Sequence, residues 1–581
     1  MLLLEMGMIV IAVILAIFKP DAGARLLAPI ERKLAFLARK PRLAVVVVGA
    51  TALLLRVSLL PIFPVPVPAV HDEFSYLLAA DTFAHGQMAN PTHPMWIHFE
   101  SFHVNQKPTY VSMYYPAQGL FLGAGQVLFG HPFWGVWLST GIMCAAICWM
   151  LQGWFPPLWA LIGGLLAVIR LGTLSYWMNT YWGGSVAALG GALVLGALPR
   201  IKRSQRILDT VLLALGLAIL ANSRPYEGLF FSLPILVALA IWLRDRTAPR
   251  RRVLLKTVFP LLFLCVLTLS LMGCYFWRTT GAPFHSPYYV NSVTYRPVPF
   301  FPWQHITRVP TYNNPELHNL YTGVITDQYN FARSHPLFLI LGKAWSTWAF
   351  YFGPLLTLPL LAACFVLPYG ITFRQLSRRT KLMIAVCGTV LFAAALPVCY
   401  DAHYLAPLTC VFYALVLTAM QKVRRWRVFD RATGVALVRS VPLVALAMLL
   451  VATSGIVPMN ISPAIWVSRM VFRTYRADLM AKLSKIPGLH LVIVHYNSDH
   501  QPMDEWVYNS ANIDHAKIVW ARDLGPAQNT ELLNYFSDRR VWLVEPDMTP
   551  PRLMKYKSAS FGDSRSLDSQ QTHGLSPEHS D

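Results

Sequence analysis

The apolar stretch A-V-V-V-V-G-A-T-A-L-L-L-R-V-S-L-L-P-I-F (44–63) leads, after a proline-rich run, into H-D-E-F-S-Y-L-L-A-A-D-T-F-A-H-G (71–86). The first segment is long enough to cross a bilayer, which takes about 20 apolar residues. Asp72 and Glu73 therefore stand just beyond a membrane span, at the start of a long polar loop. Because two adjacent carboxylates beside a membrane are energetically costly, this pair points to a functional site.

The composition predicts a polytopic α-helical membrane protein. The 581 residues are 55% hydrophobic and only 13% charged, with a mean hydropathy of +0.45, whereas soluble proteins carry about 25% charged residues. The net charge of +21 could suggest nucleic acid as a partner. However, the basic residues fall in short loops between apolar spans, which the positive-inside rule explains better. We therefore predict the lipid bilayer, and no nucleic acid, as a partner.

Hydropathy predicts about twelve spans, on the criterion of roughly 20 apolar residues each. They lie near residues 2–18, 43–62, 132–152, 156–175, 183–199, 207–222, 226–243, 253–276, 353–371, 382–399, 403–420 and 435–457.

The connections between these spans alternate between two kinds. One kind is rich in Lys and Arg (19–42, 202–206, 244–252, 374–381 and 422–431), which places it in the cytoplasm. The other kind is rich in Trp, Tyr, His and Pro, and includes the two long outer loops 63–131 and 277–352. Every motif whose side chains could take part in catalysis or ligand binding falls in this second set of connections. We therefore expect one catalytic region over residues 1–459, with its active face outside the cytoplasm.

The last part of the chain reads as a soluble α/β domain on the outer face. Apolar strand patterns at 490–496, 517–521 and 541–545 alternate with helix-like segments at 504–515 and 530–536. This order predicts a small parallel sheet within a domain spanning residues 460–555. Residues 556–581 are rich in Ser, Asp and His, and this composition predicts a disordered tail.

No metal or other cofactor is predicted. The eight cysteines lie mostly in apolar stretches and show no paired metal-ligand spacing. The sequence has no D-x-D motif, and His85, His93, His98 and His103 make no strong zinc pattern.

Several outer-loop motifs together resemble a known family. They are the Asp-Glu pair with Y-L-L-A-A-D-T-F-A-H-G (76–86), H-P-M-W-I-H-F-E (93–100), Y-Y-P-A-Q-G (114–119), S-Y-W-M-N-T-Y-W-G-G (175–184), N-S-R-P-Y-E-G (222–228) and H-Y-L-A-P (403–407). Over roughly residues 42–420 the chain resembles the GT-C membrane glycosyltransferases that use polyprenyl-phosphate sugars. This group includes protein O-mannosyltransferases and the lipid A aminoarabinose transferase, and the resemblance is to an uncharacterised bacterial branch of it. The tail lies outside the shared region.

The resemblance implies a role for the acidic pair. In such enzymes a sugar moves from a lipid phosphate to an acceptor hydroxyl or amine. The phosphate leaves without needing a proton, so one general base suffices. By resemblance Asp72 is that base, and Glu73 supports it or positions the acceptor. The alternative interpretation is that the pair caps an interfacial helix, since carboxylates favour helix N-termini.

Four outer-face cations are candidates for binding the donor phosphate. Lys107 precedes Pro108, and the resemblance implies a Lys-Pro pair against the phosphate, although Glu100 is not adjacent to it here. Arg224 in N-S-R-P-Y-E-G offers a guanidinium suited to bidentate phosphate contact. Arg296 and His403 are similar candidates. The alternatives are a snorkelling lysine, an ion pair of Arg224 with Glu227, and a hydrogen-bonded structural histidine.

Aromatic side chains are candidates for lining the sugar or lipid site, namely Tyr115, Trp177, Tyr181 and Trp182. Aromatic faces stack on sugars, but Trp and Tyr at span ends also form the interfacial aromatic belt, and we favour this second interpretation.

The resulting hypothesis is an inverting glycosyltransferase of the bacterial inner membrane. It would move a sugar from a polyprenyl-phosphate donor to an envelope glycan, glycolipid or protein on the periplasmic face. The alternative is a transporter or flippase of polyprenyl lipid or sugar. Transport requires polar groups along a path at mid-membrane, and few predicted spans carry one, Arg170 being an exception. A third possibility is that the tail acts as an assembly or carbohydrate-binding module.

Overall fold

The computed structural model describes residues 1–245, 250–366, 376–454 and 474–556. Within these residues, eight helices are long and apolar enough to cross a membrane, and three shorter apolar helices, Leu2–Phe18, Pro157–Arg170 and Ile207–Ala221, accompany them. The chain is therefore a multi-pass α-helical membrane protein. The predicted boundary at 459/460 and all but the first residue of the predicted disordered tail fall outside the described residues.

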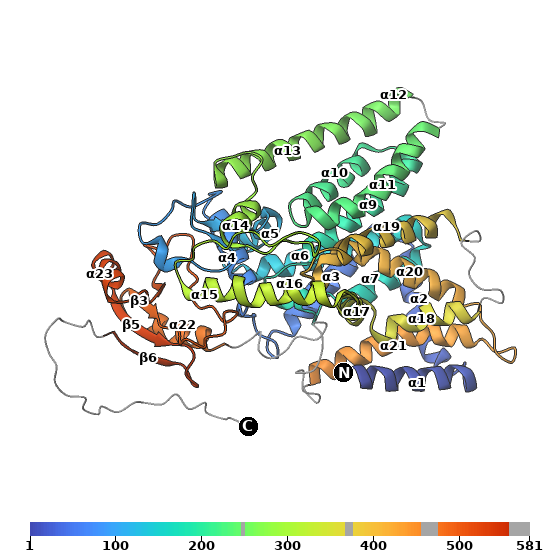
Figure 1. Cartoon of the computed structure of the whole chain (residues 1–581). Coiled ribbons are helices and arrows are strands. Elements are labelled where there is room, and N and C mark those ends of the chain that lie inside the picture. Colours follow the sequence, from blue (N-terminus) through green and yellow to red (C-terminus); the bar gives the residue numbers. More distant parts are fainter. Residues whose placement is uncertain (246–249, 367–375, 455–473, 557–581) are drawn as a thin grey trace.

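The N-terminal elements form one side of the helical region. They are α1 (Leu2–Phe18), α2 (Ala24–Ala38) and α3 (Pro41–Ser58). Helix α1 packs beside α21 (Thr433–Ser454), and α3 packs on α6 (Phe133–Trp154), so the two ends of the membrane region meet. Figure 1 shows α1 and α21 side by side at the lower edge of the helical region.

The first outer loop contains regular structure of its own. It holds α4 (His71–Ala84), η1 (Trp96–Phe99), the short antiparallel strands β1 (Val104–Asn105) and β2 (Val111–Ser112), and α5 (Pro116–Phe129).

The centre of the bundle is α9 (Ser185–Ser204), almost all of whose residues are buried. It packs against α6 and α10 (Ile207–Ala221). Close approach requires small side chains, because a Cβ at Gly191 would lie 2.3 Å from the carbonyl oxygen of Pro407. The surrounding elements are α7 (Pro157–Arg170), α8 (Tyr176–Asn179), α11 (Pro225–Asp245), α12 (Arg250–Val253), η2 (Leu254–Val258) and α13 (Phe259–Thr280).

The second predicted outer loop, 277–352, is helical at both of its ends. Helix α13 extends to Thr280, and from Pro336 the helices α17 (Pro336–Thr347), η4 (Trp348–Phe352) and α18 (Gly353–Val366) follow one another. The span expected at 353–371 therefore belongs to a helical run that begins at Pro336. Between these limits lie α14 (Pro287–Tyr295), α15 (Pro315–His318), η3 (Asn319–Val324) and α16 (Ile325–Ser334). The last membrane elements before α21 are α19 (Arg378–Ala395), η6 (Ala402–Leu408) and α20 (Thr409–Val423).

The C-terminal unit is built on a four-stranded sheet with strand order β4-β3-β5-β6. Strands β3 (His490–Val494), β4 (Ile518–Arg522) and β5 (Arg540–Glu545) are parallel, as the sequence predicted, whereas β6 (Arg552–Lys555) adds an antiparallel edge. Helices α22 (Tyr475–Lys485) and α23 (Pro526–Tyr535) accompany the sheet.

The helix expected at 504–515 is absent, and this prediction was wrong. Trp506, Val507 and Tyr508 are all buried, and three consecutive buried side chains do not fit one face of a helix. The side-chain amide of Asn509 instead pairs with the backbone of Trp520 in β4. It donates to the carbonyl oxygen of Trp520 and accepts from its backbone nitrogen, each at a distance of 2.8 Å. Segment 504–515 is thereby held alongside the sheet.

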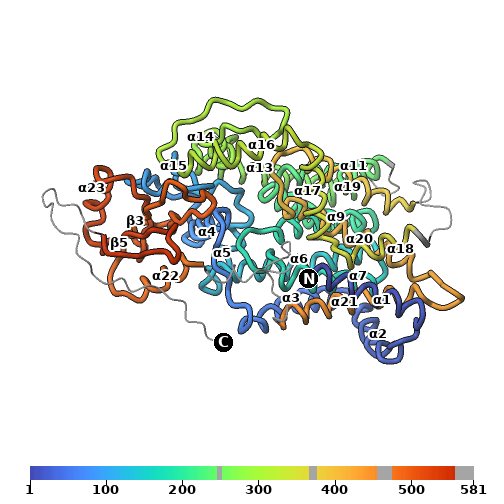
Figure 2. Tube along the Cα trace, turned by 60° about the horizontal axis from the view of Figure 1, so that its bottom comes forward, coloured from blue at the N-terminus to red at the C-terminus, as the bar shows by residue number. Residues whose placement is uncertain are grey.

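The C-terminal unit docks onto the first outer loop. The rings of Phe74 and Tyr508 stack with their centroids 4.3 Å apart, and Asp81 accepts a 2.8 Å hydrogen bond from the backbone nitrogen of Ala511. Figures 1 and 2 place the sheet at one end of the molecule, beside α4, with the membrane helices at the other end. The loop that carries Asp72 therefore lies between the membrane bundle and the C-terminal unit.

Candidate active site

The acidic pair lies in the first turn of α4, after an extended proline-rich segment. Carboxylates at this position interact favourably with the helix dipole. The two side chains nevertheless point to different partners, so their roles separate in the structure.

Glu73 is buried and holds the chain together. Its Oε2 accepts hydrogen bonds from the backbone nitrogens of Ala69 (2.9 Å) and Val70 (3.2 Å), and its Oε1 accepts one from Tyr181 (2.9 Å). Burial raises the pKa of Glu73 to about 7, although the three N–H donors act in the opposite direction. This arrangement supports the capping interpretation for Glu73, and with both oxygens engaged, it is a positioning residue.

Asp72 instead faces three polar rings. Its Oδ1 lies 3.0 Å from Nδ1 of His103 and accepts a short hydrogen bond from the hydroxyl of Tyr114. Its Oδ2 lies 3.6 Å from Nε2 of His71. The Tyr114 hydroxyl is also 2.9 Å from Nδ1 of His103, which closes a triangle on one carboxylate oxygen.

Backbone contacts bring His103 to this place. His103 adopts a left-handed conformation (φ 60°) just before β1. Its carbonyl oxygen accepts from the hydroxyl of Ser75 on α4 (2.7 Å) and from the backbone nitrogen of Met113 after β2 (3.1 Å). The β1–β2 hairpin therefore carries the imidazole back to the start of α4.

The electrostatics keep Asp72 ionised. Burial alone would raise the pKa of Asp72, but the adjacent His103, together with His71 and His403, outweighs burial, so the pKa is lowered well below its ordinary value. Burial, assisted by His103, lowers the pKa of His71 to about 4, so this ring is neutral at pH 7. Asp72 is therefore a carboxylate with an open side, 13% exposed, at ordinary pH.

The same cluster could hold a metal ion. His71, Asp72 and His103 each offer a ligand atom, and these atoms lie within 4.8 Å of one another. Two imidazoles and a carboxylate suit Zn²⁺ and similar transition metals. In this structure, however, Tyr114 and His103 already satisfy Oδ1 of Asp72. That no metal is required stays a prediction.

Arg224 supplies a cation to the same region. It lies between α10 and α11, with its guanidinium carbon 4.3 Å from the centre of the Tyr404 ring. Tyr76 and Asp401 each interact electrostatically with both Arg224 and Asp72. Within the described part of the chain, no hydrogen bond or ion pair engages the guanidinium, and the alternative pairing with Glu227 is not formed as a contact. Arg224 is thus available to an anion.

His403 joins this group from η6. Its Nδ1 lies 3.1 Å from the hydroxyl of Tyr176, and its ring centre is 5.0 Å from that of Trp182. His403 is buried, and it lies close enough to Asp72 to interact with it electrostatically when the imidazole is protonated. His403 is therefore a hydrogen-bonded histidine, which agrees with the alternative interpretation from the sequence. It is also a neighbour of Asp72, the candidate base.

Arg296 and Tyr115 lie at the margin of the region around Asp72 and Arg224. Arg296 belongs to the second outer loop, and Tyr115 faces that loop from the first. The Nε of Arg296 donates to the carbonyl oxygen of Val298 (2.7 Å), and its guanidinium stacks over Phe300. The ring of Tyr115 lies 6.4 Å from that of Tyr288, and Tyr288 also feels the charges of Arg224 and Arg296.

Lys107 occupies a different place. It is exposed at the turn between β1 and β2, and its ammonium lies 4.1 Å from the centre of the Trp96 ring. No contact described for Lys107 connects it to Asp72 or Arg224. The structure brings Arg224 and His403 towards Asp72, but leaves Lys107 apart from them.

Two of the four aromatic candidates are core residues. Trp177 is fully buried against Phe350 and Tyr351, and Tyr181 is 1% exposed, with its hydroxyl donating to the carbonyl oxygen of Pro66 (2.8 Å). Gly184 permits this packing, because a Cβ there would lie 2.4 Å from the Trp177 ring and the residue has φ +118°. Trp182, beside His403, is the tryptophan of this motif that faces the polar cluster.

Sequence reasoning missed four members of the site: His71, His103, Tyr114 and Asp401. His71 directly precedes Asp72, and Asp401 precedes the motif containing His403, so both were adjacent to recognised signals. Burial, reinforced by the charge of Asp72, raises the pKa of Asp401 to about 6.

Comparison with known proteins gives similarity at the level of structure only. No protein-family model and no curated protein matches the chain. The similar solved structures include ArnT from Cupriavidus metallidurans bound to undecaprenyl phosphate, with 13% identity, TM-score 0.46, and coverage of 86% of this chain and 92% of that one.

They also include the Archaeoglobus fulgidus oligosaccharyltransferase tethered to an acceptor peptide, with 12% identity, TM-score 0.45, and coverage of 86% and 68%. Both likenesses have TM-scores below 0.5, and neither carries a functional conclusion for this chain.

Proposed function

We propose that this protein is an integral-membrane glycosyltransferase. It takes a sugar from a polyprenyl-phosphate donor and transfers it to a hydroxyl or amine of an envelope glycan, glycolipid or protein. The observation that carries the proposal is that an ionised carboxylate, Asp72, and an unpaired guanidinium, Arg224, both act on Tyr76 and Asp401, beside membrane-spanning helices.

Asp72 acts as the general base in this proposal. Its carboxylate takes the proton from the acceptor hydroxyl or amine as the acceptor oxygen or nitrogen forms a bond to the anomeric carbon. The bond between that carbon and the phosphate oxygen breaks at the same time, and the electron pair leaves with the polyprenyl phosphate. Positioned bases of this kind contribute roughly 10²–10⁴-fold to rate.

Arg224 holds the leaving phosphate. Its guanidinium can donate two parallel hydrogen bonds to phosphate oxygens, and it offsets the charge that develops as the sugar departs. His403 and Arg296 lie around the same region and would complete the phosphate site.

The arrangement favours inversion at the anomeric carbon. A retaining double displacement needs a second carboxylate as nucleophile. Glu73 is unsuited to this role, because backbone N–H groups occupy both of its oxygens. A single displacement assisted by Asp72 inverts the configuration.

The location also forms part of the proposal. The basic connections favour the cytoplasm for the opposite face, and this supports the proposal that Asp72 and the C-terminal unit face the periplasm of a bacterial inner membrane. There the donor would be presented in the outer leaflet.

The test is turnover by the purified protein with a panel of radiolabelled polyprenyl-phosphate sugars. Wild-type protein should release one sugar from its lipid, and Asp72→Asn should lose this turnover at unchanged protein level. A second arm uses proteoliposomes with labelled lipid. Lipid movement across the bilayer without sugar transfer would favour the flippase alternative instead.

A further inference from the structure

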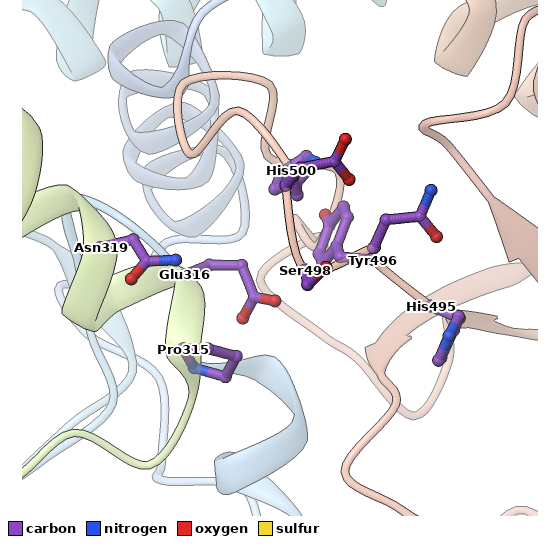
Figure 3. Close-up of a pocket in the computed structure, with 9 residues that line it drawn as sticks. Pro315, Glu316, Asn319, His495, Tyr496, Ser498 and His500 are labelled. Atoms are coloured by element: carbon purple, nitrogen blue, oxygen red, sulfur yellow. The ribbon is translucent and has the colours of Figure 1, made fainter.

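A polar cavity of about 650 Å³ lies between the second outer loop and the C-terminal unit. One wall is formed by α15 and the start of η3, and the other by residues 495–500, which follow β3. Figure 3 shows Glu316 and Asn319 facing Tyr496 and Ser498 across it. The volume falls within the range of about 300–1,000 Å³ that is typical of small-molecule sites.

The cavity occupies the place where open parallel sheets bind ligands, outside the carboxyl ends of the strands. The segment after β3 lines the cavity, and residues that follow β4 and β5 hold this segment in place. Asp523, after β4, pairs with His495 (2.8 Å), and Asp547, after β5, pairs with His500 (2.6 Å) and accepts from the backbone nitrogen of Asn497 (2.9 Å). Loop 495–500 is thus fixed from both sides, and the cavity wall is preformed.

Its lining has unused hydrogen-bonding capacity. Within the described residues, no hydrogen bond engages the side chains of Asn497, Ser498 or Asp499, and Oε1 of Glu316 is likewise unengaged. His500 is 8% exposed and lines the cavity, and its Nε2 has no partner. The Tyr496 ring, stacked on His500 with centroids 3.9 Å apart, adds an aromatic surface.

The charge of the lining selects among ligands. Glu316 and Asp499 line the cavity, and no Lys or Arg among the described residues does. Arg522 lies behind Glu316 and is held by it (2.7 Å) and by Glu505. A phosphate or a uronate would therefore meet carboxylates. A hydroxyl-rich ligand without negative charge fits, because hydroxyls and ammonium groups can donate to these oxygens and an aromatic ring packs against a sugar face.

Hydrogen bonds connect the wall of the cavity to the loop that carries His103 to Asp72. Arg522 donates to the carbonyl oxygen of Glu100 (3.2 Å), and its own carbonyl oxygen lies 3.0 Å from Nδ1 of His98. Both residues belong to the loop that delivers His103. The charge of Glu505 reaches His71, and that of Asp72 reaches Tyr321 in η3.

We propose that this cavity binds a saccharide that is neutral or carries an amine, and that this saccharide is part of the acceptor. The binding itself follows from the cavity, whereas the acceptor role rests on the proposed glycosyltransferase function.

The test is calorimetric titration of the purified full-length chain with three probes: cellopentaose (neutral), a chitosan pentasaccharide (ammonium-bearing) and a pentagalacturonate (anionic). Ser498→Trp fills the cavity from an exposed loop position. Glu531→Gln changes an exposed residue of α23 outside the cavity and serves as the control. Asp72→Asn separates binding from catalysis.

Wild type, Glu531→Gln and Asp72→Asn should bind cellopentaose or the chitosan pentasaccharide equally, and Ser498→Trp should weaken binding at least ~10-fold, or by about 1.4 kcal/mol. The inference is overturned if the wild type binds neither cellopentaose nor the chitosan pentasaccharide, or if it binds the pentagalacturonate best. It is also overturned if Ser498→Trp binds the probes as the wild type does. Absence of sugar transfer with intact, Ser498-dependent binding would overturn the acceptor role and the proposed function, while leaving the saccharide site in place.

Discussion

Nδ1 of His103 lies 3.0 Å from Oδ1 of Asp72, although Asp72 lies in the first turn of α4 and His103 directly precedes β1. This contact, closed by the Tyr114 hydroxyl, keeps the carboxylate ionised in a largely buried position. A general base must be unprotonated at the working pH. The His103–Asp72 pair supplies this condition.

We expect His103→Gln to make activity sensitive to acid. His103 is the main influence that lowers the pKa of Asp72, and burial raises it. Without the imidazole the pKa of Asp72 should rise, so that the carboxylate becomes protonated, and activity falls, at a higher pH than in the wild type. The measurement is kcat/KM between pH 5 and 8, in which the acidic limb should move upward, with a loss of ~10-fold or more at its low end.

The matched control for that variant is His85→Gln. His85 lies at the C-terminal end of the same helix and is 61% exposed, and its ring contacts Asp81 rather than Asp72. An unshifted acidic limb in His103→Gln, or an equal shift in His85→Gln, would contradict the assignment.

Glu73 should make stability fall as pH rises. Burial raises the pKa of Glu73 to about 7 in the folded protein, above the value of about 4.3 expected for an unfolded chain. Between these values the folded state binds more protons than the unfolded state, so stability is full below pH 4.3 and declines as pH approaches and passes 7. The effect is on the order of 3 kcal/mol.

Thermal unfolding of the wild type and Glu73→Gln between pH 4.5 and 8 checks this effect. Glutamine retains one carbonyl acceptor for the backbone N–H groups but does not titrate, so the variant should lose the part of the decline that Glu73 causes. Identical pH profiles for the two proteins would show that Glu73 ionises without affecting the folded state.

Arg224→Ala should impair use of the lipid donor. Removing a bidentate phosphate contact from a largely desolvated site should lower kcat/KM for the donor by ~10²-fold or more. Arg278→Ala is the control, because Arg278 is an exposed cation at the end of α13. Equal losses in both variants would indicate that outer-face charge in general, rather than Arg224, attracts the donor.

Arg522→Met should loosen the C-terminal unit. Arg522 is buried and pairs with Glu316 of the second outer loop and Glu505 of its own unit. Removing one partner of a buried ion pair costs about 3–5 kcal/mol, because the remaining charge is left unpaired. Limited proteolysis should then release the C-terminal unit faster than in the wild type or in Arg552→Met, an exposed position on β6. Unchanged cleavage rates would mean that the apolar contact around Phe74 alone holds the unit.

The position of Asp72 could be predicted from sequence because charge beside an apolar span is locally visible. The roles of its neighbours could not, because His103 reaches Asp72 only through a hairpin and a left-handed backbone conformation, and neither leaves a clear local signal. The choice between capping and catalysis for Glu73 likewise depended on Tyr181, which is distant in sequence.

Other differences have similar physical causes. Periodicity suggested a helix at 504–515, but Asn509 satisfies the backbone of β4 instead. The docking of the C-terminal unit onto the first outer loop has no local sequence signal, because Phe74, Tyr508 and their neighbours come from distant segments and form one apolar cluster. Parallel pairing of β3, β4 and β5 followed from the strand and helix order, since that order is local.

The most direct test of the account is donor turnover by wild-type protein and Asp72→Asn under identical conditions. The account predicts that the wild type releases sugar from one polyprenyl-phosphate donor, and that the variant, folded and present at the same level, loses at least ~10²-fold of this activity. A variant that turns over the donor at the wild-type rate would contradict the assignment of Asp72 as the general base.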